Sequence, residues 1–422
     1  MNQAKAMKKS IKLYVSLIVV CFVCSRLSPA GATPSPAFHR GGTNECQECH
    51  TNKNADSRDF AQMLREIKGL NRPRSDKSSD LRGSDESSTC LRCHEAPRGT
   101  RNPTGHYVAT NISDLRGGLP PSQMTPGGDF GWLKKSYFWK PPDERGPGHW
   151  SSGFLHGHSI LAMDYGYDGN SDYYTAPGGS YPARNLSCIS CHDPHATIAK
   201  GPGDRGSYRL LGGKGYSPSS AGGMAFAIDP PVAVAPRGYN RAEYATETRV
   251  AYGKGMSEWC TNCHANSCSG SYGHAVCNNA RFGVVIAANY NAYRKTGDLN
   301  GMESRSFTSL VPFEEGTDNI SFLHQHANTD GRYTSGPGPS ANVMCLTCHR
   351  AHASAWDNMT RWNMTTPFIV YKGNYPGIDN GSPVRLAQGR TSAETKKAYY
   401  DRPATFFASY QRSLCDKCHP KD

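Results

Sequence analysis

The sequence predicts a fold that is mostly coil, with a few short helices and little or no sheet. Glycine and proline supply 44 and 28 of the 422 residues, and few segments repeat apolar residues with the period of a helix or a strand. A chain so rich in loops has little apolar surface from which to build a core. However, 12 of its 16 cysteines fall in six C-x-x-C-H units. Covalently attached groups would then replace much of the missing core.

The six units share one pattern, in which two cysteines are separated by two residues and followed directly by a histidine. They are Cys46, Cys49, His50; Cys90, Cys93, His94; Cys188, Cys191, His192; Cys260, Cys263, His264; Cys345, Cys348, His349; and Cys415, Cys418, His419. This pattern is typical of c-type haem attachment. Zinc ribbons also use C-x-x-C pairs, but they do not require a histidine after every pair, and a disulfide scaffold predicts no such regularity. The sequence therefore predicts six haem c groups, with cysteine thioethers and proximal histidines from these units.

The spacing of the units predicts one domain rather than a series of repeats. They begin at residues 46, 90, 188, 260, 345 and 415, and these gaps are too unequal for tandem copies of one module. We expect residues 33–422 to form a single hexahaem cytochrome c domain that wraps around a continuous haem stack.

Three segments have helical periodicity. Residues 59–70 carry an apolar stripe, and residues 281–295 carry another that ends before Gly297. Residues 391–400 begin with a Thr391-x-x-Glu394 capping box. Short helical turns are also expected around each haem motif.

The N-terminus resembles a secretory signal. Four lysines precede an apolar run over residues 13–24, and Ala30-Gly31-Ala32 offers a cleavage site after residue 32. A cut after residue 37 is the alternative. The apolar run is short for a bilayer span, and no later segment is long and apolar enough, so no transmembrane segment is expected after signal removal. We expect an exported protein at the outer cell surface or outside the cell, with the periplasm as the alternative.

The charge of the chain does not indicate nucleic-acid binding. The formal net charge of +12 falls to +7 once the five basic residues of the signal are removed. Six haems would add about 12 propionate carboxyls, which are the expected partners of much of the remaining basic excess.

The iron atoms also need ligands on their second face. Ten histidines lie outside the motifs, which is enough for histidine on both faces of all six irons, although methionine is a competing ligand. His195 and His352 each follow a motif histidine by three residues. Such a short segment cannot easily pass round a porphyrin, so we expect each to bind a neighbouring haem. The alternative is a surface histidine beside a propionate.

Two other features remain. Cys268 and Cys277 lie outside the motifs, and an exported protein favours a disulfide between them over two thiols. Asp168, Asn170 and Asp172 resemble the start of a calcium loop, but the glycine and glutamate that complete such a loop are missing.

Segments outside the haem motifs show a family resemblance. AFHRGG (37–42), QMTPGGDFGW (123–132), TAPGGSYPA (175–183), VAYGKGMSEWC (250–260), PFEEGT (312–317) and CHRAHAS (348–354) resemble OmcS-type hexahaem cytochromes, the extracellular filament cytochromes of metal-reducing bacteria. The resemblance implies a coil-rich subunit that polymerises head to tail, with a continuous haem stack and two histidines on every iron. The implied distal ligands are His39, His106, His158, His195, His274, His326 and His352, whereas His149, His156 and His324 have no counterpart.

The sequence departs from this family at two positions. Members that form filaments place a histidine just past the first motif, where it binds a haem of the next subunit, but here that position is Lys53. Cys268 stands about where the family tends to carry another histidine. Three outcomes are therefore open. His39 takes over the bridging role, the subunits join without a shared ligand, or the protein stays monomeric.

These observations predict electron transfer with no catalytic residues. The expected partners are further copies of the chain, other redox cytochromes and extracellular acceptors such as metal oxides. A terminal nitrite or oxyanion reductase is the alternative, and it would require an open iron position. A monomeric periplasmic shuttle is the second alternative. Since all six motifs end in histidine, conduction is the favoured function.

Overall fold

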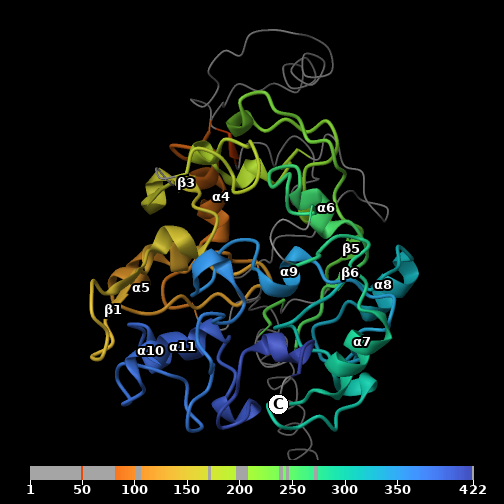
Figure 1. The fold of residues 1–422 in the computed structure, drawn as a ribbon. Coiled ribbons are helices and arrows are strands. Elements are labelled where there is room, and N and C mark those ends of the chain that lie inside the picture. The colour runs from red at the N-terminus through yellow and green to blue at the C-terminus, as the bar shows by residue number, and fades with distance from the viewer. Residues whose placement is uncertain are drawn as a thin grey trace, which may run out of the picture. The chain divides into compact units, whose positions relative to one another are not determined.

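The computed structural model describes residues 49–50, 81–100, 106–169, 173–195, 208–236, 241–243, 247–269 and 274–420 (Figure 1). All of them belong to one compact unit, Cys46–Asp422. The predicted signal, the predicted helix at 59–70, Cys46, Lys53 and His39 lie outside the described residues.

The helices are short and are separated by long loops (Figure 1). The α-helices are α4 (Glu86–His94), α5 (Ile112–Arg116), α6 (Met256–Cys260), α7 (Gly283–Ala292), α8 (Ile320–His326), α9 (Cys345–Cys348), α10 (Val384–Ala387) and α11 (Ser392–Ala398). Turns of 3₁₀-helix cover Phe130–Lys134, Gly153–His156, Met163–Tyr165, Ala183–Asn185, Cys188–Ser190, Tyr208–Leu210, Ser219–Ala221, Glu303–Arg305, Asp357–Met359, Ala404–Phe406 and Leu414–Lys417.

Two of the predicted helices are present. Helix α7 lies inside the predicted range 281–295, and α11 begins as its capping box predicts. The Thr391 hydroxyl accepts the amide of Glu394 at 3.2 Å, and the Glu394 carboxylate accepts the amide of Thr391 at 3.0 Å.

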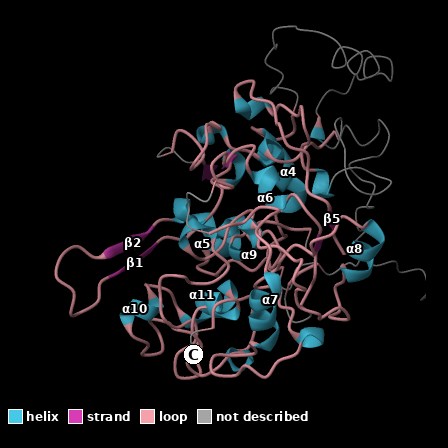
Figure 2. Cartoon of the chain, turned by 45° about the vertical axis from the view of Figure 1, so that its right-hand side comes forward, coloured by secondary structure: helices cyan, strands magenta, loops and turns pink. Residues whose placement is uncertain are grey.

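Strands are equally short in the described part of the chain. They form three antiparallel pairs: β1 (Tyr137–Trp139) with β2 (His149–Ser151), β3 (Leu161–Ala162) with β4 (Tyr167–Asp168), and β5 (Ala233–Val234) with β6 (Ala251–Tyr252). Figure 2 shows β1 and β2 as a hairpin. In its register, Phe138 is opposite Trp150. The architecture confirms a fold of coil with few short helices and little sheet.

The apolar core is divided into several clusters. The largest contains the aromatic residues Trp132, Tyr290, Trp356, Trp362 and Tyr399, and the remaining clusters each contain six buried residues or fewer. Divided clusters of this kind fit a chain whose interior is shared with large cofactors. Among the described residues, no helix is long and apolar enough to cross a bilayer.

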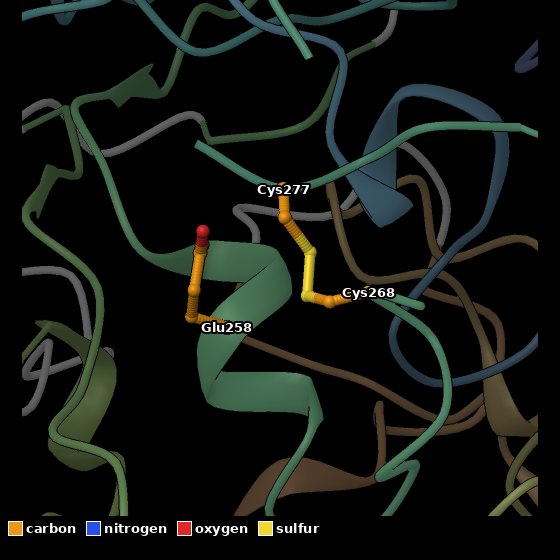
Figure 3. Close-up of side chains that lie close together, drawn as sticks. All are labelled: Glu258, Cys268 and Cys277. Atoms are coloured by element: carbon orange, nitrogen blue, oxygen red, sulfur yellow. A yellow bond between two sulfur atoms is a disulfide. The ribbon is translucent and has the colours of Figure 1, made fainter. Parts of the chain in front are cut away.

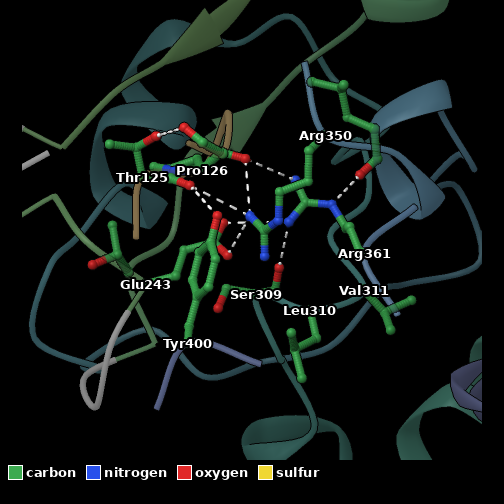
Figure 4. Close-up of polar contacts among 12 residues, drawn as sticks. Thr125, Pro126, Glu243, Ser309, Leu310, Val311, Arg350, Arg361 and Tyr400 are labelled. Carbon is green, nitrogen blue, oxygen red and sulfur yellow. Dashed lines mark hydrogen bonds and ion pairs between the residues drawn. The ribbon is translucent and has the colours of Figure 1, made fainter. Parts of the chain in front are cut away.

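A buried ion cluster joins distant segments of the chain (Figure 4). Glu243 accepts hydrogen bonds from Arg350 at 2.9 Å and from Arg361 at 3.4 Å. The guanidinium of Arg350 also lies 3.9 Å from the ring centroid of Tyr400. All three charged side chains are nearly inaccessible to solvent, at 1–3% exposure. One carboxylate therefore compensates two buried cations.

Candidate haem-binding sites

Helical turns give the motifs their local geometry. Motif cysteines lie in α4, α6 and α9 and in the 3₁₀ turns at Cys188–Ser190 and Leu414–Lys417. The amide of His264 donates to the carbonyl of Cys260 at 2.9 Å, and the amide of His349 donates to that of Cys345 at 3.0 Å. The corresponding bonds at His192 and His419 measure 3.0 and 3.1 Å. A single helical turn therefore presents both thiols and the imidazole together.

Backbone carbonyls orient the motif imidazoles. In four of them the Nδ1 atom lies 2.8 Å from a carbonyl oxygen, and the pairs are His94 with His106, His192 with Arg209, His264 with Pro177, and His349 with Asn358. This contact places the ring proton on Nδ1, so Nε2 carries the lone pair that can bind iron. The acceptors lie 9–87 residues away in sequence, so the surrounding loops set the ring planes.

Four motif imidazoles face a second imidazole at nearly constant distance. The ring centroids are 6.3 Å apart for His50–His195, 6.4 Å for His192–His352, 6.1 Å for His158–His264 and 6.1 Å for His274–His419. Two imidazole–metal bonds of about 2 Å each, together with the two ring radii, span roughly 6 Å. Each gap is therefore the right size for one metal atom between two imidazole ligands. The described residues fit haem iron.

The two histidines that follow a motif by three residues face other motifs. His195 faces His50 and not His192, and His352 faces His192 and not His349. Each short segment thus places its two imidazoles beside two different candidate iron positions. This arrangement connects neighbouring haem sites through three residues of chain.

Neither His326 nor His349 faces a second imidazole within the described part of the chain. His326 ends α8, where Nδ1 lies 2.8 Å from the carbonyl of Phe322 and the imidazole stacks on the Phe322 ring at 3.8 Å. His106 is half-buried and supplies the carbonyl that orients His94.

The unmatched histidines occupy different environments. His156 is fully buried, with Nε2 2.8 Å from the Ser151 hydroxyl and Nδ1 3.1 Å from the carbonyl of Trp132. Both nitrogens are occupied, so neither is available to iron. His149 is exposed, with Nε2 2.7 Å from Glu144, and His324 is exposed on α8.

Two buried serines connect consecutive motifs. The Ser87 hydroxyl accepts the amide of Cys188 at 3.1 Å, and the Ser257 hydroxyl accepts the amide of Cys345 at 2.9 Å. Each serine is fully buried and stands three residues before the first cysteine of its own motif. The second and third motifs, and likewise the fourth and fifth, are joined in this way. We call these two contacts the serine clamps.

The thiols beside the serine clamps are also in contact. The sulfur of Cys90 lies beside that of Cys188, and the sulfur of Cys260 lies beside that of Cys345. The candidate attachment points of two haems are therefore adjacent at each clamp.

The third and fifth motifs have the same backbone conformation and hydrogen bonds around the motif histidine. Arg209 and Asn358, whose carbonyls orient the motif histidines, both adopt left-handed backbone conformations, with φ of 52° and 57°. The next residue is left-handed in both cases, and its carbonyl accepts the amide that follows the motif histidine at 2.7 and 2.8 Å. The motif surroundings are thus repeated in space although the sequence gaps are unequal.

The remaining candidate ligands do not form an evident metal site. Cys268 and Cys277 are joined by a disulfide beside Glu258 (Figure 3), so their sulfurs are not available as thiolate ligands. Asp168 lies in β4, whereas Asn170 and Asp172 lie outside the described residues.

Facing imidazoles at iron-sized gaps, next to C-x-x-C thiols, define a multihaem c-type cytochrome. No family model matches the chain. A curated relative, the C-type cytochrome OmcS of Geobacter sulfurreducens, is 42% identical over 457 aligned positions, which cover 99% of this chain and 100% of that protein. The chain belongs to the OmcS family of c-type cytochromes.

Two solved structures agree with this assignment. The cryo-EM structure of OmcS nanowires from Geobacter sulfurreducens matches with a TM-score of 0.72 and 43% identity over 81% of this chain and 91% of that one. The outer membrane cytochrome S filament of the same organism matches with a TM-score of 0.76 and 41% identity over 90% and 99% of the two chains. The resemblance predicted from the sequence is correct, and the chain is an electron-transfer cytochrome that carries haem c.

Proposed function

We propose that the chain holds six haem c groups, each with histidine on both faces of the iron, and conducts electrons along them. The four facing imidazole pairs carry this proposal. Bound haem c supplies a one-electron Fe(III)/Fe(II) couple at each site. The chain holds each group by two thioethers, orients the proximal imidazole through Nδ1, and places a second imidazole opposite to it. Histidine on both faces leaves no iron position open to a substrate, which favours conduction over reduction of nitrite or another oxyanion.

The coordination can be tested on the oxidised protein. We expect electron paramagnetic resonance to show low-spin Fe(III) at all haems, because paired imidazoles produce a strong ligand field. Mass spectrometry should find six covalently attached haems. A stoichiometric high-spin signal would instead indicate an open iron and favour the terminal reductase.

We also propose that the protein assembles head to tail into a filament at the outer cell surface. OmcS, its relative, has been solved as a filament and as nanowires. A continuous haem chain across subunits would deliver electrons from other redox cytochromes to extracellular acceptors such as metal oxides. Residues 33–422 would form the single mature domain after removal of residues 1–32.

The junction between subunits requires a ligand in this chain. The family resemblance implies a bridging histidine at the position of Lys53, and a protonated ammonium cannot donate a lone pair to iron. His349 is oriented through its Nδ1 atom but faces no second imidazole among the described residues. We propose that His39, from the N-terminal segment, binds the iron held by His349 of the next subunit.

Electron microscopy of the secreted protein tests the assembly. We expect filaments from the wild type and only monomers or short oligomers from His39→Ala, with one iron per subunit losing its second ligand. His149→Ala is the matched control, since His149 is exposed and pairs with Glu144. Filaments of normal length from His39→Ala would assign the bridge to another residue. Monomers from the wild type at high concentration would leave a soluble shuttle.

A further inference from the structure

The disulfide between Cys268 and Cys277 closes a loop that contains a candidate iron ligand. His274 lies three residues before Cys277, and its ring faces that of His419 at 6.1 Å. The loop therefore brings a distal imidazole to the haem attached at the C-terminal motif. The Cα atoms of the two cysteines are 5.7 Å apart, so the loop returns to its starting point (Figure 3).

Within the described part of the chain, His274 makes few contacts that would hold it in this position. Its side chain is exposed, and Nδ1 lies 3.1 Å from the carbonyl of the adjacent residue, Ala275. That contact moves with the loop and does not connect it to the rest of the protein. By contrast, Nδ1 of His158 lies 2.7 Å from the carbonyl of Ala351, and His352 stacks on Phe130 at 4.7 Å. These two distal candidates are held by distant segments.

The two ends of the disulfide are anchored to the fourth motif. Cys268 comes four residues after His264, and the intervening turn is closed by a hydrogen bond from the amide of Ser267 to the carbonyl of His264 at 2.9 Å. On the other side, the amide of Asn278 donates to the Glu258 carboxylate at 2.6 Å. Glu258 belongs to α6, which also carries Cys260. The base of the loop is thus fixed to a helix that holds another haem.

We propose that the Cys268–Cys277 disulfide is a positioning device that holds His274 over the iron bound by His419. This proposal rests on the proposed ligation of that iron by both histidines. A cross-link lowers the number of conformations open to a loop, and ligand binding to iron then costs less conformational entropy. Without the disulfide, an exposed histidine on an open loop would leave the iron for a substantial fraction of the time. Cys268 and Cys277 are positioning residues, since neither touches the iron.

The test compares three variants by electron paramagnetic resonance and visible spectroscopy. We expect Cys268→Ser/Cys277→Ser to keep all haems attached while up to about one sixth of the iron becomes high-spin. Added imidazole should return that fraction to low spin, whereas the wild type should not respond because its positions are filled. His274→Ala should give the full high-spin fraction, and the triple variant should resemble His274→Ala alone. This non-additivity is expected if the disulfide acts through His274.

The outcomes separate the two proposals. If His274→Ala creates a high-spin iron but the double serine variant stays low-spin and ignores imidazole, the positioning role is wrong and the ligation stands. If His274→Ala stays low-spin, the ligation itself is wrong. Wild-type protein whose disulfide has been reduced with a phosphine, alkylated and reoxidised at the haems provides the same measurement if the serine variant fails to mature.

Discussion

Replacing His352 with alanine should leave every haem attached and convert one iron, the one bound by His192, to high spin. The ring centroids of His352 and His192 are 6.4 Å apart. Loss of one imidazole leaves water or an open position, which weakens the ligand field. We expect about one sixth of the iron to change spin state, with a shift in the potential of that haem. His195→Ala should do the same at the iron bound by His50.

This prediction also specifies which haem changes its spin state. His352 stands three residues after His349, so a spectrum that assigned the change to the haem at His349 would contradict the facing pairs. His149→Ala should leave the spectrum unchanged, because His149 pairs with an exposed carboxylate. An unchanged spectrum in both His195→Ala and His352→Ala would show that neither histidine is an iron ligand.

The second large effect is expected on stability. Glu243→Gln keeps the size of the side chain but removes the charge that compensates Arg350 and Arg361, both almost fully buried. Removing one partner of a buried ion pair costs about 3–5 kcal/mol, because the remaining charge stays in a poorly solvating environment. Burial and the nearby Arg350 already lower the pKa of Arg361, so the charged form of this side chain is destabilised before the mutation.

Denaturant unfolding of the protein with its haems attached would measure this loss. Asp330→Asn is the control, because Asp330 pairs with Arg332 on the surface and water replaces that contact. A stability change in Glu243→Gln no larger than in the control would show that solvent or a haem propionate compensates the two arginines. Haem count and spin state should remain normal in both variants, since neither residue faces a motif histidine.

The sequence predicted haem c and much of the fold because both depend on local patterns, while the individual attachment residues stay a prediction. Six C-x-x-C-H units identify the cofactor without any knowledge of tertiary structure, and Thr391 with Glu394 marks the start of α11. Helix α8 was not predicted: it has seven residues, two of them histidines, and a single capping contact from Asn319. Segments this short have too few apolar positions to show a period.

Long-range pairing could not be predicted in the same way. His158 and His264 face each other although 106 residues separate them in sequence, and only the tertiary structure brings them together. The serine clamps were also missed. A buried serine three residues before a cysteine has no distinctive pattern, and only the partner amide identifies its role. Unequal gaps between motifs suggested that no unit was repeated, yet the frames around His192 and His349 are alike.

The serine clamps also have a mechanical consequence. Each one ties the backbone at the first cysteine of one motif to a helix of the preceding motif, so the distance between two haem attachment points is set by main chain and one short side chain. Spacing within each clamped pair is therefore stiff, whereas no such serine contact joins the third motif to the fourth among the described residues. A filament under tension would lengthen first between the clamped pairs. Its electrical resistance would therefore rise between the pairs before it rose within a pair.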